Sequence, residues 1–332
     1  MRQIKFDVHL PAIGFNHAQA FATLAENLGF YCVSFGDHIF MNMTLSRNVA
    51  PSPTTPKLEC YTTLSALAAV TKRVRLMTNV TPIGFRNPAL LAKMTSTLDV
   101  ISEGRLIAGL GTGWLREEFD ACSIPFPNNQ ERTDRLAEGI SILKSMWTEE
   151  ETSHRGEYYS LEHAVNFPKP VQKPHPPIML GGFRKRILEL AAREANIVNL
   201  VPPGRSDMGQ LSYDAPRFKE KVAELFRYAR AAGRNPDAIE LSSFSFVLIS
   251  SDKSEAAAML QSVADSVGLT SEQVLQSPMV LAGTPAELRR LVRNWIEELG
   301  TTFFCCVFLN RAAMQLFARE VMPEFVSSNP SA

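Results

Sequence analysis

Short apolar runs alternate with amphipathic segments along the whole chain. Eight runs have the length of strands, and several are almost continuously apolar, which is typical of parallel strands buried on both faces. They span Ile4–Leu10, Tyr31–Gly36, Val74–Val80, Leu106–Leu110, Ile178–Gly181, Ile197–Val201, Ile239–Ile249 and Phe303–Leu309. Apolar residues recur at helical spacing between them, so the pattern predicts repeated strand–helix units.

Residues typical of helix starts and helix ends support the predicted helices. Asn87 followed by Pro88 is typical of an N-cap and a first helical position. Thr284 and Glu287 have the spacing of a capping box. Gly104 follows an amphipathic stretch, where a glycine commonly ends a helix.

Eight strands alternating with helices, without a linker, predict one α/β domain over residues 1–332, a (β/α)8 TIM barrel. An open doubly wound sheet is the alternative, but eight strands over the full length favour closure. Three long connections, at about 38–59, 148–176 and 201–213, are interpreted as insertions in the βα loops. We expect them around one mouth of the barrel, because long loops in a compact domain are often functional.

Composition narrows the function classes. The 332 residues carry 34 Lys and Arg against 34 Asp and Glu, and this balance argues against a nucleic-acid or membrane-surface partner. No apolar run is long enough for a membrane span, and the N-terminus resembles a strand rather than a signal peptide. Five cysteines without a CxxC pair are expected to be reduced. These features predict a cytoplasmic protein that acts on a small-molecule substrate.

The predicted barrel directs attention to the strand ends, where βα loops begin and barrel chemistry lies. His38, after the second strand, is the leading acid/base candidate because imidazole titrates near neutral pH. A structural histidine bonded to the backbone is the alternative. Gly181–Gly182 before a helix is a generic phosphate site, or else a tight turn that binds nothing. His9, within the first strand, could also face the mouth.

Other signals are weaker. The segment Gly109–Gly113 reads GxGxG, which by itself also suggests an adenosyl-dependent methyltransferase, but it follows the fourth strand instead of the first. Glu117 and Glu118 begin a helix, where carboxylates favour the helix dipole, so we expect a solvated cap there. No HExxH, no histidine pair at metal spacing and no GxSxG elbow is present, so no metal is predicted.

Three ordered strings carry a resemblance to a known family. They are RNPALLAKMTSTLDVISEGRLIAGLGTGWLREEFDACSIPF, RTDRLAEGISILKSMW and PVQKPHPPIMLGG. They resemble the bacterial-luciferase-like superfamily of flavin and deazaflavin enzymes, from about Phe6 to Val201 and again from Met279 onward. Within it, the chain is most similar to oxidoreductases that use coenzyme F420, and Asp37–His38 matches a DH motif of several such members.

The resemblance implies a flat, isoalloxazine-like ring at the mouth of the barrel. His38 would be the catalytic proton donor or acceptor beside the reactive ring carbon. Asn79 and Val80 would form a bulge that backs the ring, often through a non-proline cis peptide. Further cofactor contacts are expected from Asp37, Thr112, Gly113, Leu180, Gly181, Gly182 and Phe183.

The predicted function is therefore hydride transfer between F420 and a small organic substrate. The alternative is an FMN-dependent two-component monooxygenase, which uses oxygen and reduced flavin from a separate reductase. A barrel that only binds a ligand is a third possibility. A homodimer is expected from the resemblance; Leu64, Leu67, Ala68 and Met94 could form its surface or pack against the barrel. The substrate and the direction of hydride transfer are not specified.

Overall fold

The structure, a computed structural model, describes residues 3–11, 14–40, 57–201 and 215–326. Eight parallel strands pair in sequence order, and the last pairs with the first, so the sheet closes into a barrel. The strands are β1 (Lys5–His9), β2 (Cys32–Phe35), β3 (Arg75–Thr78), β5 (Leu106–Gly111), β8 (Ile178–Gly181), β9 (Ile197–Asn199), β10 (Glu240–Ile249) and β12 (Thr301–Phe308). This confirms the predicted (β/α)8 barrel and excludes the open sheet.

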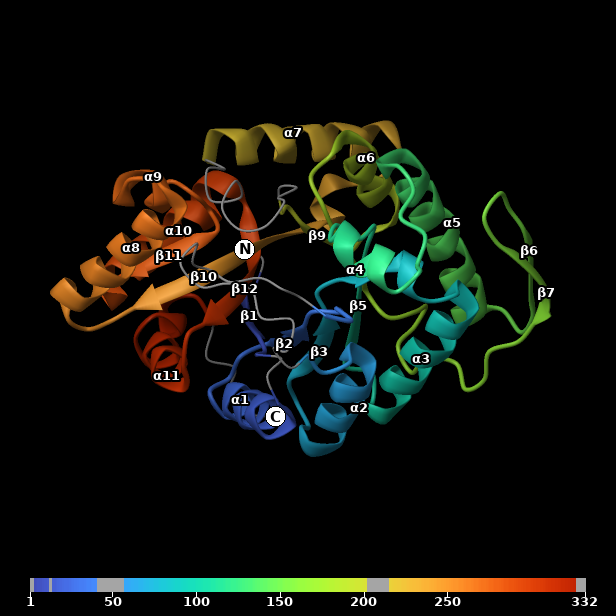
Figure 1. The fold of residues 1–332 in the computed structure, drawn as a ribbon, viewed down its shortest axis with the longest axis horizontal. Coiled ribbons are helices and arrows are strands. Elements are labelled where there is room, and N and C mark those ends of the chain that lie inside the picture. The colour runs from blue at the N-terminus through green and yellow to red at the C-terminus, as the bar shows by residue number, and fades with distance from the viewer. Residues whose placement is uncertain (1–2, 12–13, 41–56, 202–214, 327–332) are drawn as a thin grey trace.

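Helices surround the strands (Figure 1). The outer layer consists of α1 (Phe15–Asn27), α2 (Cys60–Val70), α3 (Pro88–Ile101), α5 (Asn129–Thr148), α6 (Lys185–Glu194), α7 (Ala215–Ala231), α10 (Pro285–Leu299) and α11 (Arg311–Glu320). Smaller elements extend the carboxyl ends of the strands: β4 (Thr81–Pro82), α4 (Arg116–Ala121), α8 (Lys253–Val267), α9 (Ser271–Leu275) and β11 (Val280–Gly283). The strand β11 pairs with the last residues of β10, beyond the barrel wall.

The predicted caps are present. The Asn87 side chain accepts a hydrogen bond of 2.9 Å from the N–H of Ala89 at the start of α3. At α10, Thr284 and Glu287 form the capping box. Gly104 adopts a φ of 82°, which is the left-handed conformation that favours glycine after a helix.

Successive side chains of a barrel strand point alternately outward and inward, so one layer of the core lies between strands and helices and another lies inside the barrel. Phe6 and Val8 of β1 face the helices, whereas Asp7 between them faces the barrel interior with Cys32 and Cys305. The α2 residues that could have formed a dimer surface, Leu64, Leu67 and Ala68, are buried against the barrel. They are therefore packing residues.

The connection at 148–176 corrects one prediction. It follows α5 and leads into β8, so it is an αβ connection at the amino ends of the strands and not a βα loop at the mouth. Gln172 shows this location, because it bonds to the carbonyl of Leu106 at the first residue of β5. Two antiparallel strands, β6 (Thr152–Arg155) and β7 (Ser160–Ala164), form a hairpin that projects from the molecule (Figure 1).

The other two predicted insertions follow strands, as βα loops do. The connection at 38–59 comes after β2, and the connection at 201–213 comes after β9. Residues 41–56 and 202–214 lie outside the described residues. Within the described ranges, no helix has the length and apolar character that a membrane crossing requires.

Candidate active site

The end of β3 crosses the mouth of the barrel over bare glycine backbone. The peptide bond between Asn79 and Val80 is cis. A Cβ on Gly111 would lie 2.7 Å from one methyl group of Val80, and a Cβ on Gly181 would lie 3.2 Å from the other. A Cβ on Gly109 would overlap the carbonyl oxygen of Thr78. Packing therefore requires glycine at Gly109 and Gly111 and leaves little room for a side chain at Gly181, which explains the GxG spacing without a methyltransferase site.

Two buried amides near this crossing have unused polar atoms. The Asn199 Nδ2 donates to the Asn79 Oδ1 at 3.3 Å. The Asn79 Nδ2 and the Asn199 Oδ1 have no hydrogen-bond partner among the described residues, although both atoms are buried. A buried donor and acceptor without partners are costly unless a ligand satisfies them. The two atoms therefore fit the polar edge of a bound ring.

His38 is held by a carboxylate. Its Nδ1 lies 3.0 Å from Oε2 of Glu118, which is 1% exposed. The other oxygen of Glu118 accepts hydrogen bonds from the backbone N–H groups of Ile39 and Phe40. Since a carboxylate can only accept, the Nδ1 of His38 carries the proton and its Nε2 is left to exchange a proton with a ligand.

Glu118 is the site residue that sequence reasoning missed. It was expected as a solvated cap, but helix α4 turns it inward to His38, 80 positions earlier in the chain. Trp114 lies across the same histidine, with ring centroids 5.9 Å apart, and is 41% exposed. Lys57 is close by: burial lowers the pKa of its amine, while the charge of Glu118 opposes that shift.

Asp37 is occupied within the protein. Its carboxylate makes a two-pronged ion pair with Arg86, at 2.5 and 3.1 Å. Arg86 also binds Glu59 at 2.7 Å, and its guanidinium stacks on the ring of Tyr61. Both oxygen atoms of Asp37 are thus bonded to Arg86, which in turn binds Glu59 at the start of α2. The predicted role of Asp37 as a direct cofactor contact stays a prediction.

The segment after β8 differs in detail from the predicted phosphate site. The N–H of Gly182 donates to the carbonyl of Asn199 at 3.0 Å, so it is not free as expected. Phe183 is 5% exposed, and Leu180 is fully buried in the layer between barrel and helices. The backbone at the start of α6 has no side-chain cap from Arg184, and that the first turn of this helix binds a phosphate stays a prediction.

Two further predicted residues follow β5. Thr112 is half-buried at the mouth, and its hydroxyl donates to the carbonyl of Gly113 at 3.4 Å. Gly113 has a φ of 78° and lies against Phe119, whose ring a Cβ would approach to 2.6 Å. Whether Thr112 and Gly113 line a cofactor groove stays a prediction.

Arginines gather beside the start of α6. Burial, and then the charges of Arg184 and Arg116, lower the pKa of Arg132. Arg132 stacks on Phe126, with 3.8 Å between the guanidinium carbon and the ring centroid. Its Nε is buried and has no hydrogen-bond partner within the described part of the chain. Like charges that face one another in this way favour a bound anion.

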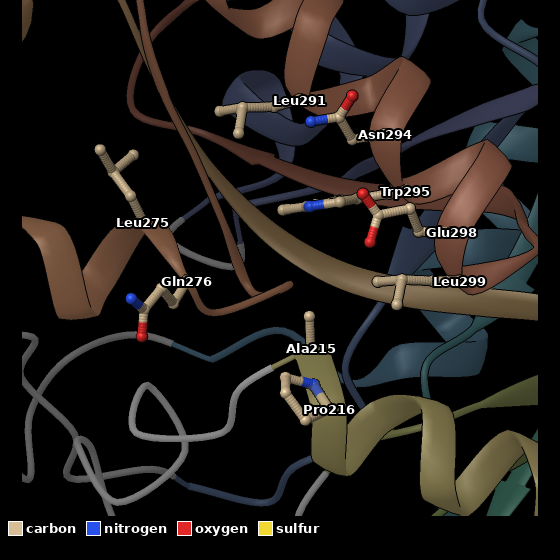
Figure 2. Close-up of a pocket in the computed structure, with 9 residues that line it drawn as sticks. All are labelled: Ala215, Pro216, Leu275, Gln276, Leu291, Asn294, Trp295, Glu298 and Leu299. Carbon is tan, nitrogen blue, oxygen red and sulfur yellow. The ribbon is translucent and has the colours of Figure 1, made fainter.

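A hollow of about 360 Å³ lies elsewhere, between α7, α9 and α10. Figure 2 shows Asn294, Trp295 and Glu298 of α10 on one side of it and Pro216 of α7 on another. None of the predicted site residues lines it. The described residues contain no group of three or more His, Cys, Asp or Glu side chains that could hold a metal ion.

Known proteins are similar to this chain in sequence and in fold. Residues 3–298 match the family described as luciferase-like monooxygenase. An FMNH2-dependent dimethylsulfone monooxygenase from Pseudomonas putida is 30% identical over 205 residues, which cover 62% of this chain and 53% of that protein. An F420-dependent glucose-6-phosphate dehydrogenase from Kineococcus radiotolerans is 37% identical over 153 residues, covering 46% and 43%. The chain thus spans about half the length of the curated relatives it matches.

One solved structure covers almost the whole chain. A monooxygenase from Streptomyces bottropensis superimposes with a TM-score of 0.76 at 25% identity, over 97% of this chain and all of that one. The relatives therefore include both FMN-dependent and F420-dependent enzymes.

Proposed function

Because the chain belongs to the luciferase-like monooxygenase family, we propose that it is an oxidoreductase that transfers a hydride between coenzyme F420 and a small organic substrate. The alternative is an FMN-dependent monooxygenase supplied with reduced flavin by a separate reductase. The observation that carries the proposal is the His38–Glu118 pair at the mouth of the barrel. It supplies an acid/base group of the kind that hydride chemistry needs.

Residues at the mouth fit a flat cofactor. Val80, seated on Gly111 and Gly181, offers an apolar face. The unpartnered amide atoms of Asn79 and Asn199 offer one donor and one acceptor to the edge of a ring. A bound deazaflavin would supply a ring carbon that accepts or donates the hydride.

The protein's own part is to manage a proton. When a substrate carbon gives up a hydride, an attached hydroxyl group must lose its proton, and the Nε2 of His38 is the base for it. The resulting imidazolium is stabilised by Glu118, which is buried and therefore acts in a medium of low dielectric constant. In the reverse direction the same imidazolium is the acid.

The arginine cluster favours F420 over FMN. FMN ends in a single phosphate, whereas F420 carries a phosphodiester and a chain of glutamates. Arg116, Arg132 and Arg184 come from three different elements, and Arg116 already pairs with Asp120 at 3.5 Å, so a tail with several negative groups can contact more of them than one phosphate can. Arg132→Ala should therefore weaken F420 binding several-fold more than FMN binding, and the exposed Arg319→Ala should change neither.

The test is turnover with each cofactor. We expect the absorbance of oxidised F420 to fall when secondary alcohols or sugar phosphates are screened with the purified chain, without oxygen uptake. Oxygen uptake that depends on reduced FMN and on substrate, with no change in F420, would establish the monooxygenase instead.

Assembly and location are also proposals. We expect a cytoplasmic homodimer. Since Leu64 and Leu67 are buried, a second copy would contact the exposed apolar residues of α3, among them Leu90 and Ile101. Light scattering of the purified chain tests this, and a monomer at micromolar concentration would contradict it.

A further inference from the structure

A second histidine at the mouth is connected to a buried carboxyl group. His9 ends β1 and lies opposite Ser34 of β2 in the parallel register. The Nδ1 of His9 lies 3.1 Å from the Ser34 Oγ, and that hydroxyl donates to the Asp7 Oδ2 at 2.5 Å. The three side chains form one hydrogen-bonded chain from the mouth down into the barrel interior.

His9 shares its surroundings with His38. A Cβ placed on Gly36 would lie 3.6 Å from the Cδ2 of His38 and 3.7 Å from the Cε1 of His9, so both rings flank the same bare glycine. The ring of Phe244 also meets His9 edge to face, with centroids 5.2 Å apart. A molecule bound at His38 would therefore lie close to His9.

We propose that Asp7, Ser34 and His9 form a proton relay, in which His9 exchanges a proton with the molecule bound at the mouth and Asp7 stores it. The proposal rests on the function proposed above: His38 takes the hydroxyl proton of the substrate, and His9 serves a second exchangeable proton of the molecule bound at the mouth.

Each of the three steps of the relay moves one proton. The bound group's O–H or N–H bond breaks and leaves its electron pair on that group, while its proton joins the Nε2 of His9. The Nδ1 of His9 gives its proton to the Ser34 oxygen, and the Ser34 hydroxyl proton passes to the carboxylate of Asp7. His9 and Ser34 end with their original charges, and Asp7 becomes a neutral acid. Reversal of the three steps returns the proton.

The electrostatics suit a relay of this kind. Burial, and then the charges of Lys57 and His38, lower the pKa of His9 to about 3, so the ring itself does not hold an extra proton near neutral pH. Burial raises the pKa of Asp7 to about 7, against the opposing hydrogen bonds from Ser34, Cys305 and Cys32. The proton is thus stored on the carboxyl group and not on the imidazole.

The hydrogen bonds through Asp7, Ser34 and His9 can run in either of two donor directions, and the position of the proton on His9 distinguishes them. With Asp7 ionised, Ser34 donates to it and His9 carries its proton on Nδ1. With Asp7 protonated, Asp7 donates to the Ser34 oxygen, Ser34 donates to the Nδ1 of His9, and His9 carries its proton on Nε2. Nitrogen NMR of the full chain with labelled histidine, without cofactor, should show His9 neutral from about pH 5 to 9 and exchanging one tautomer for the other with a midpoint near pH 7.

Variants at Ser34 test whether the tautomer exchange of His9 depends on the relay. Ser34→Ala should abolish the tautomer exchange, and Ser34→Thr should retain it because a hydroxyl is kept. Ser243→Ala removes a buried strand hydroxyl that pairs with Ser245 and should change nothing. In turnover, Ser34→Ala should lower kcat at least about tenfold, with Ser34→Thr restoring most of it.

Three results would overturn the relay: a His9 ring that becomes charged near neutral pH, a single tautomer at every pH, or Ser34→Ala turning over like the unaltered chain. Because the NMR signature needs no cofactor, it separates the two proposals. Tautomer exchange without turnover on F420 or FMN would refute the proposed function and leave the hydrogen-bonded relay standing. Turnover without the exchange would refute the relay alone.

Discussion

At the scale of single residues, the buried carboxylate of Glu118 holds the Nδ1 of His38 at 3.0 Å. It was interpreted from the sequence as a helix cap because carboxylates are common in a first helical turn. Local sequence contains no signal for a contact across 80 positions, and only the closed barrel brings α4 to the end of β2. The position of His38 could be predicted, since it lies three residues after the end of the strand β2.

Removing the charge of Glu118 should impair turnover more than binding. Glu118→Gln keeps the shape but no longer stabilises an imidazolium, and a hydrogen bond between charged groups contributes about 1.5–3 kcal/mol, so kcat should fall by one to two orders of magnitude. KM should change little. Steady-state kinetics on F420 check this, with Glu117→Gln as the control on the same turn. A kcat within twofold of the unaltered chain would show that Glu118 does not act through His38.

Asp7 should make stability depend on pH. Its folded pKa is raised from 3.8 to about 7, so it favours folding below about pH 4, and this contribution is lost as the pH rises to 7. Asp7→Asn does not ionise, so its stability relative to the unaltered chain should increase over this range, by as much as roughly 4 kcal/mol. His9 changes stability in the opposite direction but is present in both proteins. Urea unfolding from pH 4 to 8 measures the difference, and a constant offset would contradict the raised pKa.

At the scale of elements, the seat of Val80 on β5 and β8 shapes the mouth. Gly111→Ala would place a methyl group 2.7 Å from a methyl of Val80, which is too close for two carbons. We expect a loss of about 1–3 kcal/mol in the free energy of unfolding, together with weaker cofactor binding.

A second substitution tests the cause of that loss. Val80→Ala removes the methyl groups that collide, so Gly111→Ala should cost clearly less stability when Val80 is already alanine. A double-mutant cycle by urea unfolding measures the coupling. Additive effects would mean that Gly111 is required for another reason.

The elements also show how far the sequence predicts the fold. All eight barrel strands were predicted because each contains a short stretch rich in apolar residues, and several of these stretches are buried on both faces. The hairpin of β6 and β7 was missed because its second strand, Ser160–Ala164, has no buried residue and so carries no alternating pattern. The whole segment was also assigned to the wrong end of the barrel, although it follows the helix α5 and precedes the strand β8.

At the scale of the molecule, relatives with this fold use two different cofactors. The residues around the mouth, and not the fold, are therefore expected to distinguish the two. The barrel places His38, Val80 and the arginines around one mouth through strands and loops that are far apart in the chain. The sequence identified most of these residues by their position after strands. It could not show that the N–H of Gly182 and the carboxylate of Asp37 are already bonded, because their partners Asn199 and Arg86 come from other strands and loops.

The central claim is that F420 binds across this mouth beside His38, and Trp114 reports on it. The chain has three tryptophans, and Trp114 is 41% exposed with its ring 5.9 Å from His38, whereas Trp147 and Trp295 are buried. Titrating F420 into the purified chain should quench the tryptophan emission to saturation, and Trp114→Phe should remove most of the quenching. Saturable quenching that persists unchanged in Trp114→Phe, or no quenching at all, would contradict the account.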